Sequence, residues 1–344
     1  MNRPLVPLLL LAAALAGCSS SPTHRAVPAP TVSSTAPTKA SAAKPPAAPV
    51  DPFATVDPLT GAGPKRTGPV VAIKVDNETL ARPYQRGLDR AALVYQELME
   101  GGSTRLLAVF DDQSQGEVGP IRSVRESDID LLRAFGQLAV GFSGGNRGVK
   151  ETFHRAERSG WVLDASYDVL PGAYRIGEHR ADANNFFSSP GALAAARPSA
   201  SAPRDIGLRF AAAPSEGPAT VAATASYAAG STVRLVYDAP SHTYAIYQDG
   251  RRMHGVAPNN IVVQFVTERS SRYVDVLGNG TPYTVTTGGG RAVVLRDGLR
   301  VESRWLREGF GPTRLVTTGR RDVPLRPGRT WILLVPSGRP LTFS

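Results

Sequence analysis

The clearest structural element in this sequence is the run Val-Val-Ala-Ile-Lys-Val-Asp-Asn at residues 70–77. Its first six residues are apolar except for one lysine, which is typical of a buried strand. The run ends in two polar residues, Asp76 and Asn77. It therefore predicts a buried strand with polar side chains at its carboxyl end, where α/β sheets gather ligand sites.

Helical and strand patterns alternate after this run. Residues 91–98 and 105–110 are predicted as two strands, or as a helix and a strand, and residues 138–142 and 161–163 as short apolar runs. Residues 127–135, with Ser127 as a possible N-cap, and residues 147–158 have a helical pattern. This alternation predicts an N-terminal α/β domain with a mixed sheet over residues 57–198.

The character of the sequence changes after this domain. Residues 199–226 are rich in Ala, Pro and Ser and are expected to form an interdomain loop. Short alternating strands follow, separated by turn pairs such as Asp249-Gly250 and Asp297-Gly298. Residues 227–344 are therefore predicted to form a small all-β domain, sandwich or barrel-like, so that the whole chain is an α+β multidomain protein.

The N-terminus has the pattern of a lipoprotein signal peptide. Arg3 precedes an apolar run at residues 5–16, and Leu15-Ala16-Gly17-Cys18 matches a lipobox. The run is too short to cross a bilayer core of about 30 Å as a helix. Residues 1–18 are therefore expected to be the signal, with Cys18 as the lipidated N-terminus of the mature chain. Residues 19–56, rich in Pro, Ala, Ser and Thr, are expected to be a disordered linker.

Composition and charge narrow the choice of partners. One Cys in 344 residues excludes a disulfide scaffold and a Cys-built zinc site. The net charge of +10 divides into +4 for residues 1–50, −2 for 51–200 and +8 for 201–344. The C-terminal excess consists of arginine, which suits anionic lipid or wall polymer, although a general replacement of Lys by Arg explains it equally well. An exported, lipid-anchored protein does not meet the chromosome, so no nucleic acid is expected.

Polar residues at strand ends and in Gly-containing turns supply the candidates for ligand binding. Arg105, Arg122 and Arg125 could clamp a phosphate or carboxylate beside the backbone N–H groups of Gly101 and Gly102. The same charges could instead pair with one another as a network that holds the loops. The full set of candidates is Asp76, Asn77, Arg82, Glu97, Glu100, Arg105, Arg122, Ser123 and Arg125.

Two catalytic interpretations compete with binding. Residues 141–145 match G-x-S-x-G, with Ser143 as a nucleophile and Asp164 and His179 following in hydrolase order. Carboxylate pairs could act as acid and base on a wall glycan. These pairs are Glu97 with Glu100 and Asp111 with Asp112.

The sequence offers no cofactor motif and no convincing metal site. The histidines His154, His242 and His254 show no ligand spacing. No cofactor and no metal are therefore expected.

Several motifs together resemble the YerB-like bacterial lipoproteins, which are described as two consecutive domains of unknown function. The resemblance implies two domains and a lipid anchor, but no activity. One departure is Asn184-Asn185, where the family pattern reads His-Asn, which disfavours a histidine-based site there. The motifs are DPLTG at 57–61, IKVDN at 73–77, ARP at 81–83, VYQE at 94–97, EGGSTR at 100–105, GPIRSVR at 119–125, SGG at 143–145, NNIVVQF at 259–265 and PGRTW at 327–331.

These observations together favour binding over catalysis. The expected protein is anchored through Cys18 on the extracytoplasmic face of the cell membrane, and it binds an anionic envelope ligand: a wall polymer, a lipid headgroup or a partner protein. The alternative is a cell-envelope hydrolase that acts on a wall glycan or ester.

Overall fold

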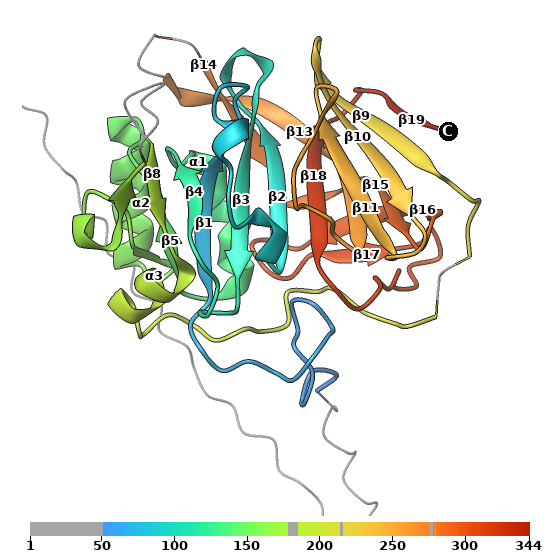
Figure 1. Cartoon of the computed structure of the whole chain (residues 1–344), viewed down its shortest axis with the longest axis horizontal. Coiled ribbons are helices and arrows are strands. Elements are labelled where there is room, and N and C mark those ends of the chain that lie inside the picture. Colours follow the sequence, from blue (N-terminus) through green and yellow to red (C-terminus); the bar gives the residue numbers. More distant parts are fainter. Residues whose placement is uncertain (1–50, 178–184, 214–215, 275–277, 279) are drawn as a thin grey trace, which may run out of the picture. The chain divides into compact units, whose positions relative to one another are not determined.

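A mixed, 14-stranded sheet runs through the protein (Figure 1). The structure is a computed structural model that describes residues 51–177, 185–213, 216–274, 278 and 280–344. The main path of the sheet is β17-β16-β15-β13-β18-β2-β3-β1-β4-β8-β7, with β14 beside β13, β5 beside β1 and β6 beside β5. The strands are β1 (Val71–Asp76), β2 (Leu93–Leu98), β3 (Thr104–Phe110), β4 (Val118–Ile121), β5 (Leu138–Gly141), β6 (Val162–Asp164), β7 (Arg175–Ile176), β8 (Phe186–Ser188), β13 (Asn260–Val274), β14 (Gly280–Val285), β15 (Gly288–Arg296), β16 (Leu299–Arg307), β17 (Arg314–Val316) and β18 (Thr330–Pro336).

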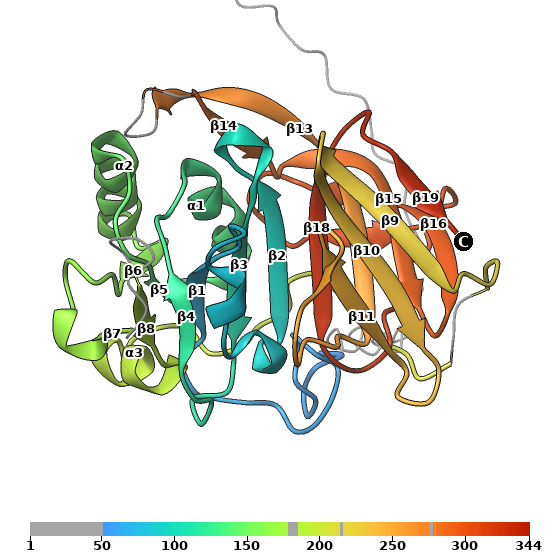
Figure 2. The same ribbon diagram turned by 45° about the horizontal axis from the view of Figure 1, so that its top comes forward.

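A second sheet of five strands lies over the C-terminal part of the first (Figure 2). Its order is β12-β11-β10-β9-β19. The strands are β9 (Ala222–Ala228), β10 (Ser231–Asp238), β11 (Thr243–Gln248), β12 (Arg251–Arg252) and β19 (Leu341–Phe343). Apolar side chains of β9, β10 and β11 share one buried cluster with those of β13, β15 and β18, which holds the two sheets together.

In the part of the chain that the structure describes, three α-helices accompany the N-terminal part of the large sheet. They are α1 (Glu126–Leu132), α2 (Arg147–Arg158) and α3 (Pro190–Ala196). Short 3-10 turns lie between the strands: η1 (Arg82–Tyr84), η2 (Leu88–Arg90), η3 (Glu100–Gly102), η4 (Arg133–Phe135) and η5 (Pro171–Ala173). The strand predicted at 70–77 and the helix predicted at 147–158 are thus confirmed as β1 and α2.

Strand β1 is buried along its whole length because both of its faces are covered. Val71, Ile73 and Val75 belong to the cluster that includes α3 and the second sheet. Ala72 belongs to the opposite cluster, which includes α1 and α2. Side chains alternate along a strand, so Lys74 and Asp76 lie on this α1–α2 face.

The C-terminal strands do not stand apart from the N-terminal ones, as a separate sandwich or barrel would require. Strand β18 pairs in parallel with β2, from Thr330 opposite Leu93 to Leu333 opposite Gln96. The side chain of Trp331 also donates a hydrogen bond of 3.1 Å to the Gln96 side chain. Because β18 is apolar on both faces and has strands on both sides, it completes one sheet from the two parts of the chain.

The stretch 199–226, expected to be a loop, ends within a strand. Strand β9 begins at Ala222, and its small residues alternate between buried and half-buried positions. Ala, Thr and Ser resemble a linker in composition, but here they let β9 pack closely on the large sheet. The prediction of a loop was wrong for residues 222–226 because it relied on composition alone.

Candidate functional site

A cavity of about 740 Å³ opens beside the carboxyl ends of β1 and β5. Its walls come from the segments that follow β1, β2, β4 and β5, from Arg105 of β3 and from Thr281 of β14. Five of the predicted candidates line it together: Glu100, Arg105, Arg122, Ser123 and Arg125. We call it the arginine cavity after its three arginines.

Arg125 and Glu100 form one wall of the arginine cavity. Arg125 Nε and Nη2 donate hydrogen bonds of 3.0 and 2.8 Å to the two Glu100 carboxylate oxygens. The Thr281 hydroxyl donates a further hydrogen bond of 2.7 Å to Glu100. Burial alone would raise the pKa of Glu100, but the Arg125 guanidinium and Thr281 hold it below its usual value. Glu100 is therefore an ionised, fixed carboxylate.

The turn that carries Glu100 depends on glycine. Gly101 has a φ of +68°, a conformation that side-chain-bearing residues rarely adopt. This turn connects β2 to β3, and both Glu100 of the turn and Arg105, the second residue of β3, line the arginine cavity. The Gly-Gly pair is thus needed for the geometry of the wall.

Arg105 and Arg122 share one carboxylate, that of Glu78. Arg122 Nε lies 2.8 Å from an Asp76 oxygen, and Arg122 Nη2 lies 3.6 Å from Glu78. Arg105 Nη2 donates a hydrogen bond of 3.0 Å to the other oxygen of Glu78. The Glu78 carboxylate therefore bridges the two guanidinium groups.

Arg105 is short of partners for a buried guanidinium. Its Nε is buried and has no hydrogen-bond partner among the described residues. Burial, and next the positive charge of Arg125, lower the pKa of Arg105. An additional anion beside Arg105 would offset both the cost of burying its charge and the repulsion from Arg125.

A buried ion group is joined to the arginine cavity through the Arg125 backbone. Lys74 contacts Glu97, and its Nζ lies 2.6 Å from an Asp128 oxygen, with all three side chains almost fully buried. The Ser127 hydroxyl donates a 3.1 Å hydrogen bond to Glu97, and Asp128 accepts one of 2.7 Å from the Arg125 backbone N–H. Burial lowers the pKa of Lys74 to about 8, although Asp128 opposes this shift. This group fixes the start of α1, and with it Arg125, on the sheet.

The candidates Asn77 and Arg82 lie on the opposite face of the sheet. The Asn77 amide contacts Gln248 of β11 at 3.3 Å, and Arg82 pairs with Asp249 at 2.7 Å. Both therefore join the large sheet to the second sheet and do not line the arginine cavity. Alternation along the strand separates Asn77 from Asp76.

The serine-hydrolase arrangement is not assembled among the described residues. The Ser143 hydroxyl donates a 2.6 Å hydrogen bond to the Ile121 carbonyl, so its proton is held by the backbone. Asp164 lies near His154 rather than Ser143, at 3.6 Å. His179, the expected base, lies outside the described residues, as does Asn184 of the Asn184-Asn185 departure.

The predicted carboxylate pairs are engaged in other contacts. Glu97 is held by Lys74, and Glu100 by Arg125. Asp111 is close to Asp57, and burial and then this neighbouring acid raise its pKa to about 7. Asp112, which accepts hydrogen bonds from Ser114, lies in a different part of the fold from the arginine cavity.

Sequence patterns missed part of the cavity wall. Tyr167 and Phe186 both line it, with ring centroids 4.1 Å apart and planes inclined by 32°. Neither residue belongs to a Gly-containing motif, and they come from different segments of the chain. Glu78 was missed too, although its position directly after Asp76-Asn77 was a usable signal.

His154 has acidic neighbours that its sequence context did not reveal. Ligand atoms of His154, Glu157 and Asp164 lie within 4.8 Å of one another. Glu157 accepts a hydrogen bond from the Asp164 backbone, and Asp164 accepts one from the Ser166 backbone, both at 2.8 Å. The Glu157 contact and the proximity of His154 to Asp164 join α2 to β6.

The fold and the cavity define a mostly β, two-sheet protein with an arginine-lined polar site. Among the described residues, no helix combines the length and apolar character needed to cross a membrane. Family models described as "Protein of unknown function (DUF3048)" match the chain at residues 59–202 for the N-terminal domain and 223–332 for the C-terminal domain. The chain therefore belongs to the DUF3048, or YerB-like, family, as its motifs predicted.

One relative comes from Bacillus subtilis (strain 168) and is provisionally named lipoprotein YerB. It is 29% identical over 280 residues, which cover 77% of this chain and 81% of the relative. The crystal structure of YerB from Bacillus subtilis matches this fold with a TM-score of 0.69 at 23% identity, over 83% of this chain and 99% of that one. This structural likeness supports the large mixed sheet and the mostly β fold.

Proposed function

We propose that this protein is a lipid-anchored envelope protein that binds an anionic ligand in the arginine cavity. The observation that carries the proposal is the position of Glu78. Its carboxylate bridges Arg105 and Arg122, yet its side chain is 41% exposed, whereas those of the two arginines are 6% and 15% exposed. Glu78 thus occupies the place that a ligand carboxylate or phosphate would take, and it can turn out into solvent.

The charge balance of the cavity supports displacement of Glu78. Asp76 and Glu100 are anchored by backbone and side-chain hydrogen bonds and cannot leave without breaking the fold locally. Glu78 is the exposed member of the set. When a ligand anion replaces it, Arg105 and Arg122 keep a negative partner, and hydrogen bonds to charged groups contribute roughly 1.5–3 kcal/mol each.

The remaining walls favour a ligand larger than a bare anion. Tyr167 and Phe186 supply an aromatic surface, and Ser123 supplies a hydroxyl. Aromatic faces pack against the apolar faces of ring-shaped ligands, and a volume of about 740 Å³ is typical of sites for small organic molecules. A sugar phosphate unit of a wall polymer has this combination of groups.

Retention on immobilised poly(glycerol phosphate) that carries glucose substituents tests the proposal, with dextran as the neutral control matrix. Residues 50–344 form one compact unit with its own buried clusters and are suitable for the assay. We expect Arg122→Lys to weaken retention about tenfold, because lysine cannot make the two-pronged contact. Glu78→Gln should strengthen retention, since it removes the competing charge.

Arg304→Gln is the matched control, because Arg304 is exposed on β16 and does not line the cavity. It should leave retention unchanged. Unchanged retention of Arg122→Lys, together with a large fall in its melting temperature, would show that these charges form a structural ion network and not a binding site.

The anchor has a separate test. Cys18 is the only cysteine, so Cys18→Ala leaves no thiol for the diacylglycerol. We expect this variant to move from the membrane fraction to the soluble fraction of the envelope. Full retention in the membrane fraction would contradict the lipoprotein assignment.

A further inference from the structure

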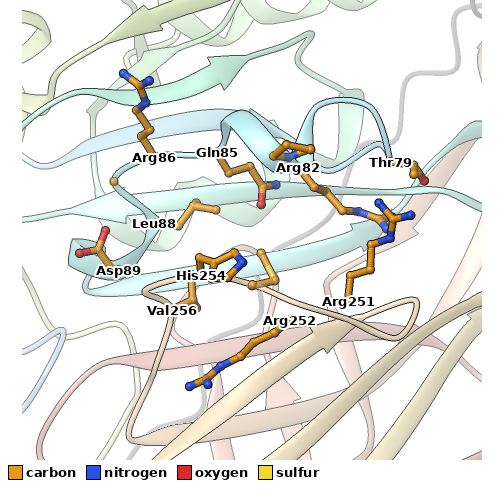
Figure 3. Close-up of a pocket in the computed structure, with 13 residues that line it drawn as sticks. Thr79, Arg82, Gln85, Arg86, Leu88, Asp89, Arg251, Arg252, His254 and Val256 are labelled. Carbon is orange, nitrogen blue, oxygen red and sulfur yellow. The ribbon is translucent and has the colours of Figure 1, made fainter.

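A second cavity, of about 390 Å³, lies on the opposite face of the large sheet from the α1–α2 face (Figure 3). One side is the segment around η1 and η2, and the other is β12 with the residues that follow it. We call it the β12 cavity. It shares no residue with the arginine cavity.

The floor of the β12 cavity is apolar. Leu88, Met253 and Val256 line it and are buried in the cluster between the sheets. In Figure 3 Leu88 and Val256 lie between the basic side chains Arg86 and Arg252. An apolar floor of this kind favours a ligand that carries hydrocarbon.

Basic side chains surround this floor. Arg82 is held by Asp249 at 2.7 Å and by the Asn77 carbonyl at 2.9 Å, which fixes the position of its guanidinium. Arg251 follows Asp249 by two residues, and in Figure 3 it points to the same end of the cavity as Arg82. Arg252 extends from the other side of the floor.

Two of these arginines lack a negative partner. Arg251 and Arg252 are both exposed, and neither side chain makes a hydrogen bond or ion pair with the described residues, although their backbones pair with β11. Exposed charges on an edge strand can also serve to prevent sheet-to-sheet aggregation. That role requires neither an apolar floor nor a fixed guanidinium beside them, and the β12 cavity has both.

We infer that the β12 cavity binds an amphipathic anion, whose phosphate or carboxylate lies against Arg82 and Arg251 and whose hydrocarbon covers Leu88, Met253 and Val256. The volume fits a headgroup and its first methylenes, not a whole phospholipid. The ligand can come from a bilayer or from a free amphiphile, because both present the same chemistry.

Calorimetric titration of residues 50–344 with octyl phosphate below its micelle concentration tests the inference. Inorganic phosphate and octyl glucoside, which carry only one of the two features, should bind more weakly. We expect Arg251→Gln to weaken octyl phosphate about tenfold, the loss of one charge-assisted contact. The control Arg304→Gln should have no effect.

Two results would overturn the inference: no binding of octyl phosphate at about millimolar concentration, or binding that Arg251→Gln leaves unchanged. Equal affinity for inorganic phosphate would exclude the role of the apolar floor. The titrations are repeated in the Arg122→Lys background, which weakens phosphate binding in the arginine cavity. A loss caused by Arg251→Gln in that background belongs to the β12 cavity, so failure of this site is separable from failure of the arginine cavity.

Vesicles identify the source of the ligand. If residues 50–344 sediment with phosphatidylglycerol vesicles but not with phosphatidylcholine vesicles, and Arg251→Gln abolishes this, then the site takes a lipid of the bilayer. If octyl phosphate binds but the vesicles do not, the ligand is a free amphiphile. Vesicle binding that persists in Arg251→Gln would place lipid contact elsewhere and overturn the bilayer source.

Discussion

Arg125 holds both carboxylate oxygens of Glu100, at 3.0 and 2.8 Å, and so ties the start of α1 to the turn between β2 and β3. The contact is two-pronged, and both side chains are largely shielded from water, at 12% exposure each. It gives one wall of the arginine cavity a fixed shape before any ligand arrives.

Arg125→Lys should destabilise the protein by about 1–2 kcal/mol, because a lysine ammonium cannot make two parallel hydrogen bonds. Urea denaturation followed by circular dichroism measures the change. Arg291→Lys, at an exposed pair with Glu302, is the matched control and should cost less than about 0.5 kcal/mol. Equal losses of unfolding free energy in the two variants would show that the Arg125–Glu100 contact stabilises the protein no more than an exposed ion pair does.

Glu97→Gln should cost considerably more, about 3–5 kcal/mol. Lys74 is completely buried, and this substitution removes one of its two carboxylate partners. Glu302→Gln supplies the exposed comparison. A Glu97→Gln protein with wild-type stability would mean that the buried lysine does not need both acids.

Glu268 gives the protein a pH dependence with a defined sign. Burial raises its pKa to about 7 from an ordinary 4.5, although Thr284 donates hydrogen bonds to it. The folded state therefore binds the proton more tightly than the unfolded chain, and stability from this group is lost as pH rises from 4.5 through 7.

Glu268→Gln should remove that loss, because glutamine can still accept the Thr284 hydrogen bond and carries no charge. The variant should gain stability relative to the wild type between pH 5 and pH 8, by roughly 3 kcal/mol at most. Melting temperatures at the two pH values measure it. A wild-type-to-variant difference that is the same at both values would contradict the assignment.

Glutamyl endopeptidase should cut the native protein after Glu216, because residues 216–219 are exposed. The two fragments should remain together, since β18 pairs with β2 and Arg307 donates hydrogen bonds of 2.9 and 3.2 Å to the Asp130 and Leu131 carbonyls. Gel filtration before and after addition of denaturant distinguishes the outcomes. Fragments that separate without denaturant would show two independent domains.

The sequence could predict the elements of this fold better than their partners. The apolar run at 70–77 and the periodicity at 147–158 are local signals, and the structure has β1 and α2 there. The pairing of β2 with β18 depends on residues far apart in the chain, which no local pattern encodes. The three-dimensional structure was therefore needed to show that both parts of the chain contribute strands to one sheet.

The candidate site shows the same division. Gly-containing turns located Glu100, Arg105, Arg122, Ser123 and Arg125, which do line one cavity. Asn77 was misplaced because consecutive side chains of a strand point to opposite faces of the sheet, and its amide contacts Gln248 of the second sheet. The aromatic wall of Tyr167 and Phe186 has no motif, so only the three-dimensional arrangement reveals it.

The place of β18 between β2 and β13 also sets an order of events during biosynthesis. The N-terminal strands are synthesised first. The edge of β2 that pairs with β18 stays unpaired until Thr330–Pro336 has been synthesised, almost at the end of the chain. A premature stop after Leu325 would therefore remove β18, the strand between β2 and β13. The loss of a short C-terminal segment would thus disrupt the sheet at β2, in the N-terminal part of the chain.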